Sequence, residues 1–377
     1  MTDDSPTADL VISAGRVICA ETPWDAPGDV VVRDGRVVEI TAEFAGRSRQ
    51  RLSYPDGLAL PGLVDLHAHP AESRSVFGVS PDRFLLPRGV STVLSQGDAG
   101  ADNVDAFVAE TIEPSLTRVV LAINLSRRGE STAAGCFADL ADADVDRCVA
   151  AIERHRRHIW GIAVNASHHA CESTDPREVL QRGLQAAERA GLPLLYGMRR
   201  PEDWPLADQL NRLRRGDVVT YCFRRQPHCI IQNGRVMAAV IDARERGVLF
   251  DVGHGMASFS FAVAESCLAS GFSPDTISTD SQIAHAQTQP EHSLPLVMSK
   301  LVAAGMPIED AVRAATIRPA QILGLEGVGT LRAGSPADLV VLQRSAVDEA
   351  MFDAHGEMRQ GLSWNVSAVI SAGGVVV

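Results

Sequence analysis

The central part of the chain alternates short apolar runs typical of strands with segments typical of helices. Eight such runs occur at residues 62–69, 91–97, 117–126, 159–167, 192–198, 217–223, 248–255 and 276–282. Helical periodicity is clear at 142–158 and 176–191, and the second segment begins with a proline and is closed by Gly191. Eight strand-then-helix units predict a parallel (β/α)8 barrel of the TIM type. An open doubly wound sheet is the alternative, but no GxGxxG follows the first strand to support it.

Both ends of the chain have a different pattern from the middle. They contain Val-rich runs separated by Gly and Asp turns, with Asp34-Gly35 as a hairpin signal. Matched patterns at the two ends suggest that they pair in space. We therefore expect residues 1–60 and 328–377 to form one small β-sandwich beside a barrel at 61–327.

Charge and composition exclude several classes of protein. The net charge of −12 argues against a nucleic-acid partner, which requires a basic surface. No apolar run approaches the ~20 residues of a membrane span, and the first residues do not resemble a secretory signal. The seven cysteines are an odd number without a CxxC pair, which favours free thiols in the cytoplasm. The expected partner is a small-molecule substrate, and a homo-oligomer is left open.

Residues that could bind a metal lie where strands of the barrel end. His67 and His69 are two residues apart at the end of the first strand, so both imidazoles can face the barrel mouth. Asp280 ends the eighth strand and can reach the same cavity, where a carboxylate can bind a metal and carry a proton. We expect these three residues to hold a divalent cation, with zinc as the first choice. Structural histidines and an N-cap aspartate are the alternative.

Several segments resemble the amidohydrolase superfamily. They are PGLVDLHAHP at 61–70, the aspartate of the eighth strand and GTLRAGSPADLVVL at 329–342. VLFDVGHGMASFSF and DTISTDSQ are similar to the dihydroorotase-like amidohydrolase/deacetylase branch. The resemblance implies hydrolysis of amides, cyclic amides or esters by metal-activated water. It also implies that His67, His69 and Asp280 are the ligands of the first metal.

The chain departs from the two-metal members of this superfamily at three positions. Ala163 stands where the resemblance implies a bridging lysine on strand four, and Tyr196 and Tyr221 stand where it implies histidines on strands five and six. We therefore expect at most one metal. The two tyrosines would face the lumen and donate hydrogen bonds to a developing oxyanion, with simple packing as the alternative.

Other polar residues near the strand ends complete the predicted site. His254, at the end of strand seven, is expected to have a catalytic or substrate-binding role. Arg199 and Arg224 each begin an Arg-Arg pair after a strand, which suggests an anionic substrate, and Asn165 ends strand four. The chain is therefore expected to be a hydrolase of carbon–nitrogen or ester bonds. A lyase or isomerase on the same scaffold and a catalytically silent binding protein are the alternatives.

Overall fold

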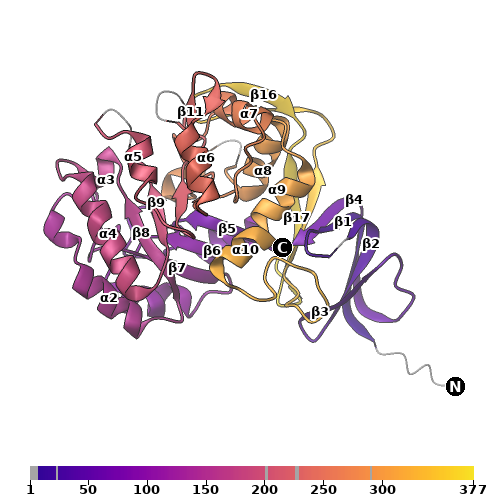
Figure 1. The fold of residues 1–377 in the computed structure, drawn as a ribbon. Coiled ribbons are helices and arrows are strands. Elements are labelled where there is room, and N and C mark those ends of the chain that lie inside the picture. The colour runs from indigo at the N-terminus through magenta and orange to yellow at the C-terminus, as the bar shows by residue number, and fades with distance from the viewer. Residues whose placement is uncertain (1–6, 23, 200–202, 226–228, 289–290) are drawn as a thin grey trace.

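A parallel sheet of seven strands forms the centre of the molecule, in the order β13-β10-β9-β8-β7-β6-β5 (Figure 1). The structure is a computed structural model and describes residues 7–22, 24–199, 203–225, 229–288 and 291–377. The strands are β5 (Leu63–Ala68), β6 (Val90–Gln96), β7 (Arg118–Asn124), β8 (Ile159–Asn165), β9 (Leu194–Gly197), β10 (Val218–Thr220) and β13 (Leu249–Phe250). Each lies within one of the first seven apolar runs of the sequence or within one residue of it.

The eighth predicted strand, at 276–282, is an irregular segment. It forms parallel bridges to both open edges of the sheet, with Asp251 just after β13 and with Ala68 in β5. Asp280 has φ 51°, in the left-handed region, so the extended conformation is interrupted there. The curled sheet is nevertheless closed by this segment, and the mixed α/β architecture fits a TIM-type fold.

Helices pack around the barrel sheet and against its amino-terminal end. They are α1 (Val104–Phe107), α2 (Val145–Arg154), α3 (His168–Cys171), α4 (Pro176–Ala190), α5 (Leu206–Leu210), α6 (Ala238–Glu245), α7 (Phe261–Ala269), α8 (Leu294–Ala303), α9 (Ile308–Ala315) and α10 (Ile317–Leu323). Short 3-10 or π turns occupy Pro81–Leu85, Leu86–Arg88, Val108–Ile112, Leu140–Asp142 and Ile283–Gln287. The Asp175 side chain caps α4 by accepting from the backbone N–H of Arg177, and Gly191 ends the helix at φ 62°, as the sequence predicted. None of the helices in the described ranges is long and apolar enough to cross a membrane.

The barrel lumen is apolar at its amino end and polar at its carboxyl end. Alternate side chains of the strands, including Leu66, Ala163 and Leu195, pack together in the lumen. Leu323 of α10 packs against the same cluster from the amino-terminal side. Because this end is filled, only the carboxyl ends of the strands can open to a substrate.

The two chain ends share a second sheet, in the order β18-β17-β14-β4-β1-β2-β3. Its strands are β1 (Ala8–Cys19), β2 (Trp24–Arg33), β3 (Arg36–Thr41), β4 (Ser48–Pro61), β14 (Leu339–Arg344), β17 (Trp364–Ser371) and β18 (Gly374–Val375). Strand β4 pairs with β1 on one side and with β14 on the other, which joins the two ends of the chain. Asp34 and Gly35 connect β2 to β3 with positive φ at both residues, the hairpin turn that the sequence indicated. Two small hairpins lie elsewhere, β11 (Ile231–Gln232) with β12 (Arg235–Val236) and β15 (Glu349–Phe352) with β16 (Met358–Gly361).

Candidate metal centre and active site

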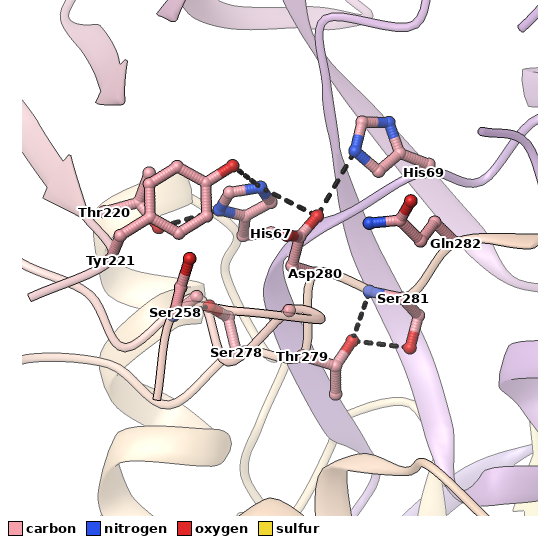
Figure 2. A network of polar contacts seen from close by, with 12 residues as sticks. His67, His69, Thr220, Tyr221, Ser258, Ser278, Thr279, Asp280, Ser281 and Gln282 are labelled. Atoms are coloured by element: carbon pink, nitrogen blue, oxygen red, sulfur yellow. Dashed lines mark hydrogen bonds and ion pairs between the residues drawn. The ribbon is translucent and has the colours of Figure 1, made fainter. Parts of the chain in front are cut away.

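His67, His69 and Asp280 meet at the mouth of the barrel (Figure 2). The Nε2 atoms of His67 and His69 lie 3.4 and 3.3 Å from the same oxygen, Oδ1 of Asp280. All three potential ligand atoms lie within 4.8 Å of one another, and all three residues are buried. Oδ1 of Asp280 has no hydrogen-bond partner in the described part of the chain, although it is buried. A buried carboxylate oxygen without a donor is costly, and a cation would satisfy it.

Neighbouring side chains orient both imidazoles toward Asp280. Nδ1 of His67 lies 2.7 Å from Oγ1 of Thr220, which itself donates to Asp251 and therefore accepts from the imidazole. Nδ1 of His69 lies 3.0 Å from a carboxylate oxygen of Asp98 and donates to it. In the neutral form of each ring the proton sits on Nδ1, so the Nε2 lone pair is then available as a ligand. The residues present therefore fit a divalent cation.

The charges of the three residues compensate one another without a metal. Burial alone would raise the pKa of Asp280, but the two histidines outweigh it and hold that pKa well below its usual range. Burial lowers the pKa of His67, but Asp280 and Asp251 outweigh it and raise the pKa to about 9. The metal-free centre thus holds protons that a bound cation would replace.

The backbone around Asp280 is fixed by close contacts. Oγ1 of Thr279 donates to Asp65 and accepts from the backbone N–H of Ser281, which anchors the residues on both sides of Asp280. Gly255 lies so close that a Cβ there would collide with Oδ2 of Asp280. The carboxylate is therefore held in place by a tight turn and a glycine.

A cavity of about 390 Å³ opens above the metal centre. It brings together His69 and Asp280 with three residues predicted for the site, Asn165, Tyr221 and Arg224. The Tyr221 hydroxyl lies 3.4 Å from Nε2 of His67. Burial and the charge of Asp280 hold the pKa of Tyr221 well above its usual value, so the phenol keeps its proton.

Arg224 lines this cavity beside Tyr221. Its guanidinium carbon lies 4.5 Å from the centre of the Tyr221 ring. Its Nε donates to Oγ of Ser258 and its Nη1 to the carbonyl of Met198. Arg224 is therefore held at the wall of the cavity, where it can face an anionic group.

The prediction that Tyr196 faces the lumen is wrong. Its hydroxyl donates to Oε1 of Gln209 in α5, at 2.9 Å, and the side chain is fully buried in the layer between sheet and helices. Leu195 occupies the lumen instead, because alternate residues of a strand face opposite sides. Tyr221 reaches the lumen side because the chain leaves the regular strand after Thr220, with φ 69° at Tyr221.

Two other predicted residues also lie away from the metal centre. Arg199 is buried in an ion pair with Asp203 at 2.7 Å and does not line the cavity. His254 contacts Lys300 at 2.9 Å and lines a separate cavity. Arg199 is therefore turned away from the cavity above the metal centre, whereas the expected catalytic or substrate-binding role of His254 stays a prediction.

Sequence reasoning missed the acidic residues around the centre. Asp98 and Asp251, which support the histidines, each lie just after a strand, and that position was an available signal. Glu130 lines the cavity from an irregular loop that has no recognisable pattern. Burial raises the pKa of Glu130 to about 7, against the opposing effect of His69.

The chain as a whole is also similar to known proteins. Residues 202–374 match the model of the amidohydrolase family. The chain is 32% identical over 333 residues to a deacetylase of Agrobacterium fabrum, covering 86% of this chain and 80% of the relative. Among solved structures, an adenine deaminase is similar with a TM-score of 0.88 and 25% identity, covering 98% of this chain and 99% of that one. A dihydroorotase is similar with a TM-score of 0.85 and 28% identity, covering 98% and 97%.

Proposed function

Because the chain belongs to the amidohydrolase family and is a hydrolase of carbon–nitrogen bonds, we propose that it works with a single divalent cation at His67, His69 and Asp280. Zinc is the first choice, since two imidazoles and a carboxylate are typical zinc ligands. The proposed substrate is a small anionic molecule with an amide, cyclic amide or ester bond. The observation that carries the proposal is the convergence of two imidazole Nε2 atoms on one buried oxygen of Asp280 that accepts no hydrogen bond from the described residues.

The residues of the cavity have separate roles in the proposed reaction. A divalent cation supplies polarisation of the scissile carbonyl and activation of water when bound. Asp280 accepts the proton of the water that attacks the carbonyl carbon, and returns it to the leaving nitrogen as the carbon–nitrogen bond breaks. The Tyr221 hydroxyl donates a hydrogen bond to the oxyanion that forms. Arg224 and Asn165 bind the polar groups of the substrate at the cavity wall.

The proposal of one cation rests on what is absent from the lumen positions. Ala163 and Leu195 present apolar side chains where a second cation would need ligands. Tyr221 keeps its proton and is a poor ligand, since a phenol binds metals as its anion. A cation without ligands would lose its hydration without compensation.

Metal analysis of the purified protein tests the proposal. We expect one equivalent of a divalent metal to remain after dialysis. His69→Ala should lose this metal. His155→Ala should retain it, because His155 lies outside the barrel and pairs with Asp105. Two equivalents that survive dialysis would overturn the single-cation proposal, and none would overturn the metal site. A screen of N-acyl amino acids, cyclic imides and small esters tests the reaction. A lyase or isomerase activity in place of hydrolysis would contradict the proposed chemistry.

We also propose a division of the chain into two units. Residues 1–60 with 328–377 are proposed as a β-sandwich unit, beside a catalytic barrel at 61–327. The shared sheet of the two ends supports this division. The seven cysteines are all free and buried, which supports a cytoplasmic location.

A further inference from the structure

Lys300 is the only lysine of the chain, although lysine and arginine together number 35. It lies in α8 and is only 5% exposed, whereas a lysine normally keeps its ammonium in water. A chain that uses arginine everywhere else has therefore buried its single lysine. Lysine differs from arginine at such a position because its ammonium is a compact point charge with three rotatable donors.

Among the residues that the structure describes, the ammonium of Lys300 has one hydrogen-bond partner, and this partner is neutral. Nζ lies 2.9 Å from Nε2 of His254. Nδ1 of His254 lies 2.9 Å from the carbonyl of Gly255 and donates to it, so Nε2 accepts from Lys300. A lysine has three N–H donors, and this contact uses one of them.

No counter-ion compensates this charge among the residues that the structure places. Lys300 forms no ion pair with a carboxylate there. The charge of Asp353 raises the pKa of Lys300. The carboxylate oxygens of Asp353 already accept the backbone N–H groups of Phe261, His355 and Glu357. Burial lowers the pKa of Lys300 to about 8, which still leaves the ammonium mostly charged at neutral pH. A buried charge without a partner is costly unless a ligand provides one.

Lys300 lines a separate cavity of about 270 Å³. Its described wall contains His254, His285, His292 and apolar or small residues, so Lys300 provides the only fixed charge among these lining residues and none of them is a carboxylate. Nδ1 of His285 accepts the backbone N–H of Gln282, which leaves the proton on Nε2 as a second donor. Nε2 of His292 donates to the carbonyl of Thr279 and is already used.

We propose that this cavity binds a small carboxylate, held by Nζ of Lys300 and by Nε2 of His285. The cavity is close to the metal centre, because Met256 lines both cavities and Gly255 touches Asp280. The carboxylate belongs either to one end of the substrate or to a free anion of the same chemistry. Binding itself does not depend on the proposed hydrolysis.

The single lysine makes a direct test available. Protein grown with ¹³C-labelled lysine gives one Cε resonance, which reports on Lys300 alone. Acetate is titrated into the protein while a bulky sulfonate is withdrawn to keep the ionic strength constant. We expect acetate to shift this resonance until the shift saturates. A carboxylate would also raise the pH at which the resonance titrates. An absent or non-saturating shift would overturn the proposal.

Variants test the same site by a second measurement. Acetate should raise the Tm of the wild-type protein to a plateau, and Lys300→Met should weaken this response roughly tenfold or more. Arg235→Met removes the same charge from an exposed position in β12 and should keep the full response. A full response in Lys300→Met would overturn the proposal. If Lys300→Met does not fold, the wild-type titration decides.

The effect of acetate on turnover separates the two sources of the carboxylate. If the substrate's own carboxylate uses the cavity, saturating acetate raises KM and leaves kcat unchanged. If a free anion is the ligand, acetate does not compete with the substrate, and KM does not rise at constant kcat. Either result is compatible with binding at Lys300, which the labelled resonance establishes independently.

Discussion

Replacement of Tyr221 by phenylalanine is the sharpest test of the proposed chemistry. The change removes one hydroxyl whose only hydrogen-bond contact among the described residues is the 3.4 Å approach to Nε2 of His67. Removal of this hydroxyl should therefore change folding stability and metal affinity only slightly. Loss of one oxyanion donor typically lowers kcat by about 10²–10³, which corresponds to about 2.7–4 kcal/mol of transition-state stabilisation. We expect Tyr221→Phe to lose turnover on this scale, with KM nearly unchanged.

Tyr196 offers a matched control on the neighbouring strand. Tyr196→Phe removes the same atom, but its hydroxyl binds Gln209 between sheet and helices. We expect about 0.5–1.5 kcal/mol less stability to unfolding by denaturant and unchanged kcat. Turnover with a hydrolysable substrate and metal content would be measured for both variants. Full turnover in metal-loaded Tyr221→Phe, or equal loss in both variants, would refute the reasoning.

Three further predictions concern the metal centre and its surroundings. Asp280→Asn should lose the metal and at least as much activity as Tyr221→Phe, because it removes a ligand and the proton carrier; elemental analysis and turnover check this, and full activity would contradict it. Gly255→Ala should weaken metal binding, because the new Cβ would displace the Asp280 carboxylate; an unchanged metal titration would count against that contact. Burial lowers the pKa of His292 to about 3, so the unfolded chain takes up a proton below about pH 6.5 while the folded one does not. The metal-free protein should therefore lose up to about 1.4 kcal/mol per pH unit from this group between pH 6.5 and 3, and His292→Gln should show a shallower loss in denaturant unfolding across that range.

The sequence predicted the barrel strands and the three residues that the fold brings together as the candidate metal centre. Both predictions relied on local signals, namely apolar runs and polar residues at their carboxyl ends. The eighth strand was predicted as regular, and the left-handed backbone of Asp280 that interrupts it has no signature in a Ser-Thr-Asp-Ser sequence. Strand existence was therefore easier to predict than strand geometry.

The orientation of Tyr196 could not be predicted, for a physical reason. Strands of a parallel barrel are buried on both faces, so their sequences do not alternate between apolar and polar residues. The run LPLLYGM is apolar throughout and gives no indication of which residues face the lumen. Partners distant in the chain, such as Gln209 for Tyr196, determine the direction of such side chains. Glu130, in a loop, and Lys300, in α8, were missed because only the fold brings them to a cavity wall.

The sheet shared by the two chain ends has a consequence for synthesis on the ribosome. Strand β4 emerges early, but β14, which pairs with it at Leu58 to Pro61, follows only about 280 residues later. At translation rates of about 5–20 residues per second, this edge of β4 waits roughly 15–55 s for its partner. An unpaired strand edge is a site of aggregation. Nascent chains that stop before residue 339 would therefore carry every residue of the proposed catalytic site and still expose this edge.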